Sequence, residues 1–273
     1  MTVLFLLSDK LTVLINGLKR RLQGVNQLMH TEYLDYSDGE NNTFEAFVAY
    51  EDSKSGKRPC VLISHAWGGQ SEGERNKAKA LAELGYIGFA LDVYGKGKRG
   101  SSMDENAKLM QPFMDDRALL LKRLLAAVDE AEKHPQVDKD RIAAIGFCFG
   151  GLCVLDLARS ADPRVKGVVS FHGLFSKSTV KNDKPITAKV LIEHGYDDPM
   201  ATPENMVEIA AELTERKADW QIHAYGNTVH AFTNPEANMP ENGIVYNADA
   251  DRRSWTAMKN FFEELFVPAK VAV

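Results

Sequence analysis

The sequence predicts an α/β fold in which helices cover both faces of a mostly parallel sheet. Short apolar runs typical of buried strands alternate along the chain with longer segments that have helical periodicity. The length of 273 residues, with 44% hydrophobic and 26% charged residues, fits one globular domain of this class. Strands and helices that alternate at this spacing need crossover connections, and these connections place helices on both faces of a parallel sheet.

The first predicted elements form a hairpin, because the alternating segments 33–36 and 44–50 flank the turn-rich residues 37–42. Further strands are expected at the short apolar runs 60–64, 86–91, 142–145, 167–171, 190–194 and 220–225. Helices are expected where apolar residues recur with a period close to 3.6, at 74–84, 115–133, directly after Phe149, 203–216 and 250–265.

The first 28 residues do not continue this pattern. We expect residues 1–28 to form an N-terminal extension and residues 29–273 to form a single domain. The apolar run 3–7 lacks a preceding basic residue and is followed at once by Asp9 and Lys10, so a secretory signal is not expected. Because no run of about 18 apolar residues occurs, we also expect no membrane-spanning helix.

Charge and cysteine content exclude several classes of protein. The net charge of −5 lacks the basic character of a nucleic-acid-binding protein. Three cysteines argue against a disulfide framework and favour a cytoplasmic protein, which we expect to be a monomer or a weak homo-oligomer. No paired Cys-x-x-Cys or His-x-x-x-His spacing occurs, so neither a metal nor another cofactor is expected.

The strongest chemical signal is the segment Gly-Phe-Cys-Phe-Gly at residues 146–150, which lies between a predicted strand and a predicted helix. A nucleophile at the centre of such a turn has a strained backbone, and the flanking glycines are needed because a Cβ there would collide with neighbouring backbone. The helix N-terminus favours a thiolate at Cys148. Cys60 and Cys153 have no such motif, and we expect both to be buried packing residues.

A cysteine nucleophile needs a base and a residue that orients the base, and these follow in the chain order nucleophile, acid, histidine. Asp198 lies in the turn after the strand 190–194, and His230 follows the last predicted strand. Asp198 is therefore the predicted acid and His230 the predicted base. Asp197 is the alternative acid, since it lies in the same turn.

Two backbone amides are expected to stabilise the oxyanion that forms on the substrate. One is the N–H of Phe149, directly after the nucleophile. The other is the N–H of Trp67, in the loop that follows the first central strand. These roles use only the backbone, so the indole of Trp67 is free to line the pocket as well.

Four motifs together resemble the dienelactone hydrolase family of α/β-hydrolases. They are Gly-Phe-Cys-Phe-Gly-Gly at the nucleophile, His-Ala-Trp-Gly-Gly in the oxyanion loop, Gly-Tyr-Asp-Asp-Pro at the acid and Val-His-Ala-Phe at the base. The similarity covers about residues 31–266. The resemblance implies an α/β-hydrolase fold and a triad of Cys148, His230 and Asp198 that acts on a small ester or lactone.

The sequence departs from the family pattern at two positions. The family has a glutamate where this chain has Ala66, and a substrate-binding arginine where this chain has Asn234. The departures concern the identity of the substrate more than the reaction type. Alternative interpretations are a general carboxylesterase or thioesterase of the same fold, a non-catalytic binding protein and a redox-responsive thiol protein.

Overall fold

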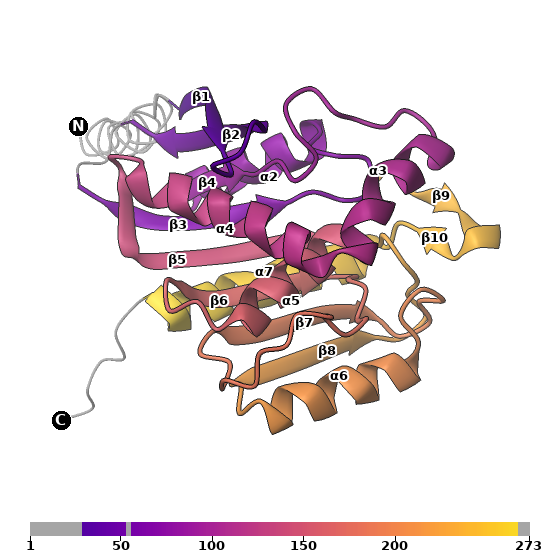
Figure 1. Ribbon diagram of the computed structural model, residues 1–273. Coiled ribbons are helices and arrows are strands. Elements are labelled where there is room, and N and C mark those ends of the chain that lie inside the picture. The colour runs from indigo at the N-terminus through magenta and orange to yellow at the C-terminus, as the bar shows by residue number, and fades with distance from the viewer. Residues whose placement is uncertain (1–28, 53–55, 267–273) are drawn as a thin grey trace, which may run out of the picture.

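The computed structural model describes residues 29–52 and 56–266, which form an eight-stranded sheet with helices on both faces (Figure 1). The strand order is β1-β2-β4-β3-β5-β6-β7-β8. The strands from β4 to β8 run parallel to one another, whereas β2 is antiparallel to both of its neighbours, β1 and β4. The strands are β1 (Met29–Ser37), β2 (Thr43–Glu51), β3 (Arg58–Ser64), β4 (Ile87–Ala90), β5 (Val137–Phe147), β6 (Val165–Phe171), β7 (Lys189–Gly195) and β8 (Trp220–Tyr225). The predicted fold class is confirmed.

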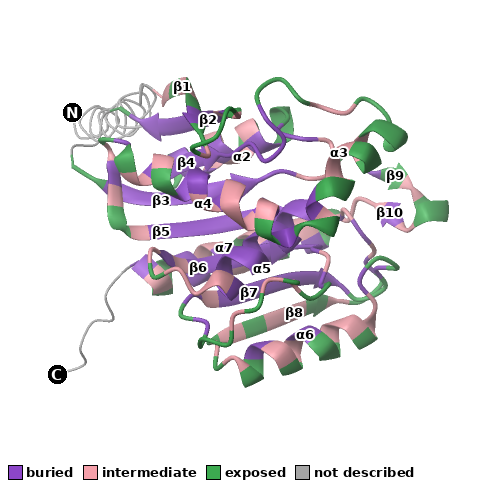
Figure 2. Cartoon of the chain, viewed as in Figure 1, coloured by how far each residue is buried: buried purple, intermediate pink, exposed green. Residues whose placement is uncertain are grey.

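Alternating side chains of the central strands pack against helices on opposite faces of the sheet. Leu62 belongs to the apolar cluster that contains residues of α4 (Arg117–Lys133), α5 (Phe149–Ser160) and α6 (Pro203–Glu215). The next residue, Ile63, belongs to the cluster of α2 (Glu72–Glu83) and α7 (Ala248–Phe266). Figure 2 shows the result, a sheet whose central strands are buried from both sides.

The boundaries of several elements differ from those that the sequence predicts. The helix expected at 115–133 is preceded by a separate helix, α3 (Met103–Asp115), and Asp116 ends α3 and caps α4 through its carboxylate, which accepts from the N–H of Leu119 at 2.9 Å. Strand β5 begins at Val137, five residues earlier than expected, since Val137 is buried although charged residues follow it.

A small hairpin that the sequence analysis did not predict follows the loop of His230. It consists of β9 (Asn238–Met239), a 3₁₀ turn (Pro240–Asn242) and β10 (Ile244–Val245). Its strands contain only two residues each, so they carry no measurable hydrophobic periodicity.

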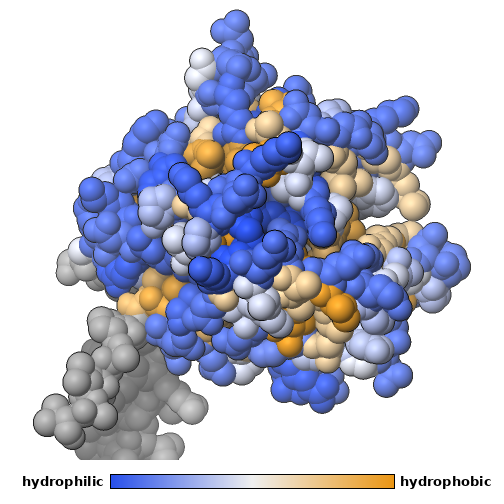
Figure 3. All heavy atoms as spheres, turned by 60° about the horizontal axis from the view of Figure 1, so that its bottom comes forward, coloured by the Kyte–Doolittle hydropathy of each residue, from blue (hydrophilic) through white to orange (hydrophobic). Residues whose placement is uncertain are grey.

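The extension expected over residues 1–28 lies outside the described residues. Within residues 29–52 and 56–266, no helix combines the length and the hydrophobicity needed to cross a membrane. The face shown in Figure 3 is mainly hydrophilic, with separate apolar patches between polar residues.

Candidate active site

Cys148 occupies the sharp turn between the end of β5 and the start of α5. Its backbone has φ 57° and ψ −116°, a conformation that is strained for a residue with a Cβ. The turn is fixed by its neighbours, because the N–H of Cys148 donates to the carbonyl of Phe171 at 3.1 Å. A Cβ at Gly146 would overlap the carbonyl of Gly150, and a Cβ at Gly150 would overlap that of Ser64. Both glycines are therefore required, for the reason that the sequence suggests.

His230 and Asp198 form a buried pair on two neighbouring loops. His230 Nδ1 lies 2.7 Å from Asp198 Oδ2, and the two residues are 2% and 1% exposed. The other carboxylate oxygen, Asp198 Oδ1, accepts from the N–H of Met200 at 2.8 Å. Asp197, the alternative acid, is exposed, and its backbone N–H donates to the carbonyl of Thr228. The geometry favours Asp198 as the orienting acid.

Cys148 lies close enough to His230 to interact with its ring electrostatically. Burial alone lowers the pKa of His230, but the neighbouring Cys148 and the Asp198 carboxylate raise it, and the resulting pKa is about 10. Nε2 of His230 is buried and forms no hydrogen bond of good geometry within the described part of the chain. Catalytic hydrogen bonds are often long before substrate binds. The surroundings therefore favour the protonated, imidazolium form of His230.

His172 packs directly against the ring of His230, a contact that the sequence analysis did not assign. The ring centroids are 5.1 Å apart at an interplanar angle of 68°. His172 Nε2 lies 2.8 Å from Thr233 Oγ1, and the N–H of His172 donates to the carbonyl of Glu193 at 2.8 Å. Burial and the positive charge of His230 hold the pKa of His172 well below its ordinary value. A neutral imidazole therefore supports the loop that carries His230.

The unpredicted hairpin holds the backbone of His230 from both sides. The N–H of His230 donates to the carbonyl of Gly243 at 2.9 Å, and the N–H of Val245 donates to the carbonyl of His230 at 3.1 Å. Gly243 has φ +65°, and a Cβ at this position would overlap the ring of Pro199, which directly follows Asp198. The hairpin thus joins the loop of His230 to the loop of Asp198.

The two backbone amides expected to form the oxyanion hole belong to Trp67 and Phe149, and Tyr94 contacts both residues. The N–H of Trp67 makes no hydrogen bond among the residues that the structure describes, and the N–H of Phe149 is the first amide of α5, so it has no partner within the helix. The Tyr94 hydroxyl donates to the carbonyl of Trp67 at 2.9 Å, and the Tyr94 ring stacks on Phe149 at 6.0 Å. Tyr94 therefore contacts both residues.

The two positions at which the sequence departs from the family pattern have local structural roles. The carboxylate of Glu74 lies 3.5 Å from the N–H of Ala66 and accepts from the N–H of Ser71 at 2.7 Å, so it supports the oxyanion loop from α2. Asn234 is exposed, and its Oδ1 accepts from the N–H of Glu236 at 3.1 Å. This side chain stabilises its own turn.

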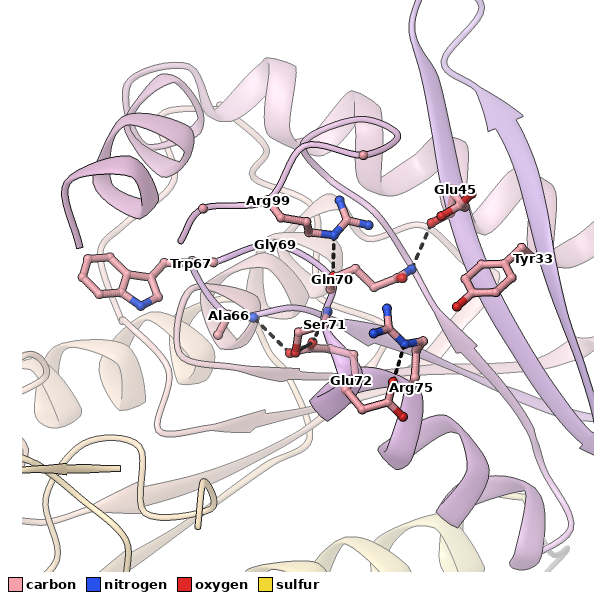
Figure 4. Close-up of a pocket in the computed structure, with 14 residues that line it drawn as sticks. Tyr33, Glu45, Ala66, Trp67, Gly69, Gln70, Ser71, Glu72, Arg75 and Arg99 are labelled. Atoms are coloured by element: carbon pink, nitrogen blue, oxygen red, sulfur yellow. Dashed lines mark hydrogen bonds and ion pairs between the residues drawn. The ribbon is translucent and has the colours of Figure 1, made fainter. Parts of the chain in front are cut away.

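A hollow of about 620 Å³ lies beside the oxyanion loop, lined by Trp67, Gln70, Arg75 and Arg99 among others (Figure 4). The catalytic candidates do not line it. The Arg75 Nε donates to Glu72 at 2.9 Å, and the Arg99 Nε donates to the carbonyl of Gln70. These cations are therefore engaged in holding the loop and the start of α2.

The chain is similar to known proteins over most of its length. The family model described as the dienelactone hydrolase family matches residues 44–266. A solved structure, the dienelactone hydrolase-like promiscuous phosphotriesterase P91 from metagenomic libraries, is 36% identical with a TM-score of 0.81, and the match covers 87% of this chain and 98% of that one. The structure named m3DLH is 35% identical with a TM-score of 0.83, over 87% and 99% of the two chains. An uncharacterized Caenorhabditis elegans protein, K02A2.1, is 33% identical over 154 residues, which are 56% of this chain and 98% of that protein.

Proposed function

Because the chain belongs to the dienelactone hydrolase family of carboxylic-ester hydrolases, we propose that it cleaves an ester or lactone with Cys148 as its nucleophile. His230 serves as the base and acid, and Asp198 orients the imidazole. One observation carries the proposal. Cys148 has a positive φ at the N-terminus of α5 and interacts with His230. The Nδ1 atom of His230 lies 2.7 Å from Oδ2 of the buried Asp198.

In the first half of the proposed reaction, the Cys148 thiolate attacks the carbonyl carbon of the substrate. The negative charge that develops on the carbonyl oxygen is held by the N–H groups of Trp67 and Phe149. The tetrahedral intermediate collapses, the bond to the leaving oxygen breaks, and the imidazolium of His230 donates its proton to that oxygen. The acyl group then remains on Cys148 as a thioester.

In the second half, a water molecule enters beside the thioester. Neutral His230 removes a proton from the water, which attacks the acyl carbon, and the Cys148 thiolate is released together with the carboxylic acid. Asp198 keeps Nδ1 of His230 protonated and stabilises the imidazolium in both halves. For a lactone, the leaving alkoxide is part of the same product molecule.

The proposal is tested by measuring hydrolysis of aryl esters, lactones, acyl thioesters and a phosphotriester, the last because of the similarity to P91. The variant Cys148→Ala is expected to lose about a thousandfold or more in kcat, and Cys148→Ser is expected to be weak because a hydroxyl does not ionise easily. Cys60→Ala is the matched control, since Cys60 is a buried thiol in the middle of β3. Full activity in Cys148→Ala would overturn the assignment.

Alkylation by iodoacetamide distinguishes this proposal from the interpretation as a non-catalytic binding protein. Cys148 should react first, because Cys60 and Cys153 are fully buried and burial raises the pKa of both thiols. Turnover should disappear in proportion to the alkylated fraction. An unreactive Cys148 in a protein that hydrolyses none of the substrates would favour a binding role instead.

A further inference from the structure

A second cavity, of about 530 Å³, lies where the end of α3, the loop after β6 and the start of α6 meet. Its lining combines apolar and polar side chains: Met114, Leu174, Phe175, Ser176, Lys177, Met200, Asn205 and Glu208. A volume of this size is typical of a site for a small organic molecule.

Four of the eight residues that line this cavity are apolar. Met200 is 42% exposed although it is a large hydrophobic residue, and Met114 and Leu174 are only partly buried. Methionine side chains adapt their shape to apolar ligands. Two of the polar residues already have protein partners, since Ser176 accepts from Arg117 and Asn205 belongs to the cap of α6. Lys177 and Glu208 carry opposite charges at exposed positions, so the cavity has no net preference for an ionic ligand.

The cavity is connected to the proposed triad through two of its lining residues. The backbone N–H of Met200 donates to Asp198 Oδ1 at 2.8 Å. The ring of Phe175 lies 5.1 Å from the ring of His194, which interacts electrostatically with both Asp198 and His230. The cavity therefore borders the loop that carries the proposed acid, Asp198.

We propose that this cavity binds an apolar chain of the substrate ester, so that the preferred substrates are esters with an unbranched hydrocarbon chain of several carbons. The inference rests on the proposed function of the triad and adds the class of substrate. The chain can belong to the acyl half or to the alcohol half of the ester, because both halves extend from the same carbonyl.

Two substrate series distinguish the halves. The first keeps the p-nitrophenyl leaving group and lengthens the acyl chain from acetate through butyrate and hexanoate to octanoate. The second keeps the acetyl group and lengthens an alkyl alcohol, with the released acid followed by titration. We expect kcat/KM to rise by up to about fourfold for each methylene that becomes buried, in one of the two series.

A pair of matched variants assigns the effect to this cavity. Met200→Glu places a charge in the cavity and should reduce the ratio of long-chain to short-chain kcat/KM by about tenfold or more. Met103→Glu makes the same change at a methionine that is 49% exposed at the start of α3 and lines neither cavity, so its ratio should equal that of the unmodified protein. Circular dichroism and thermal unfolding verify that both variants fold.

The outcomes separate this inference from the proposed function. Flat or falling kcat/KM in both series, with hydrolysis that still depends on Cys148, would overturn the inference and leave the proposed function intact. A rise that Met200→Glu does not change would also overturn it, because the chain would then bind elsewhere. If the protein hydrolyses no ester and Cys148 is not alkylated, the proposed function fails, and this inference fails with it.

Discussion

At the scale of single residues, the site depends on one strained backbone conformation. Cys148 has φ 57°, which costs a non-glycine residue on the order of 1–3 kcal/mol. Cys148 stands at the N-cap of α5, where the positive end of the helix dipole attracts a negative charge. The two glycines of the turn and the hydrogen bond to Phe171 maintain the strain in the folded state.

The neighbouring aspartates of the acid turn provide a direct test of the orienting residue. Asp198→Asn should lower kcat by a factor of about 10²–10⁴, because an amide cannot stabilise the imidazolium and favours the wrong tautomer of His230. Asp197→Asn makes the same chemical change on an exposed side chain and should leave kcat within about twofold. Steady-state kinetics of the two variants on one aryl ester decide between them. Equal losses in both would contradict the assignment of Asp198.

The raised pKa of His230 predicts a pH-dependent contribution to stability. Burial lowers this pKa, but Cys148 and Asp198 raise it from its ordinary value of 6.5 to about 10, so the folded protein binds a proton that the unfolded chain releases. The stabilisation is complete below pH 6.5 and is lost as the pH rises toward 10.

Urea unfolding of the unmodified protein and of His230→Gln measures this effect. The difference between their free energies of unfolding should be largest at about pH 6.5 and below, and it should shrink steadily as the pH rises toward the pKa of about 10. A difference that stays constant or grows over this range would mean that the folded protein does not hold the proton on His230.

At the scale of elements, the hairpin β9–β10 positions His230 relative to Asp198. It binds the backbone of His230 through the carbonyl of Gly243 and the N–H of Val245, and it contacts Pro199 next to Asp198. A hairpin with two-residue strands contributes little to the core. Its contribution is to hold the loops of His230 and Asp198 in place.

Gly243→Ala should therefore damage both stability and turnover. The new Cβ overlaps the Pro199 ring in addition to the cost of a positive φ, which is about 1–2 kcal/mol by itself. Gly39→Ala is the control, because Gly39 has φ +82° with no atom within 4 Å of the new Cβ, in the turn between β1 and β2. Gly243→Ala should lose more stability than Gly39→Ala and about tenfold in kcat, whereas Gly39→Ala should keep its kcat. Thermal unfolding and steady-state kinetics check both; equal kcat values would contradict the positioning role.

Most of the sheet could be predicted from the sequence because its central strands are buried on both faces. The runs at 60–64 and 190–194 are continuously apolar or nearly so, and they form β3 and β7. Helix α3 was missed because its sequence contains Pro112 and several charged residues, and only Phe113 is buried. The start of β5 is not evident from the sequence, because the charged residues 138–141 separate Val137 from the apolar run that begins at Ile142.

Part of the candidate site can be predicted from local motifs in the sequence, and part depends on contacts between distant residues. Cys148, Asp198 and His230 could be proposed because each lies in a short motif at the end of a strand, and parallel strands bring such ends together. His172, Tyr94 and the hairpin could not be proposed, because their importance comes from contacts with residues distant in the sequence. The signal in the sequence is weak, because His172 directly follows the expected strand 167–171 but lies in no recognisable motif.

At the scale of the whole molecule, a buried ionic network connects the helices on the α5 face of the sheet. Asp156 on α5 accepts from Arg117 Nε of α4 at 2.8 Å and from Arg159 Nη1 at 3.1 Å. Arg159 Nε also donates to Glu212 of α6 at 2.7 Å. Both arginines donate to Ser176, which lines the 530 Å³ cavity. The network thus couples the packing of three helices to the wall of the proposed substrate pocket.

Removal of the central carboxylate should destabilise the whole fold. Asp156→Asn leaves two buried guanidinium groups without their shared counter-charge and should lower the free energy of unfolding by about 3–5 kcal/mol. Asp129→Asn breaks an exposed ion pair with Arg164 and should cost less than about 1 kcal/mol. Urea denaturation of the two variants tests this difference. A loss below about 1 kcal/mol in Asp156→Asn would show that the network contributes little to stability.

The covalent intermediate provides the most direct test of the molecule's chemistry. A p-nitrophenyl ester is mixed with the protein, the reaction is stopped with acid during turnover, and digested protein is examined by mass spectrometry. The account predicts one acyl group on the peptide that contains Cys148, released by hydroxylamine and absent from Cys148→Ala. An acyl group on a different residue would contradict the proposed role of Cys148. An acyl-enzyme burst in the release of p-nitrophenol, with Cys148 left unmodified, would also contradict it.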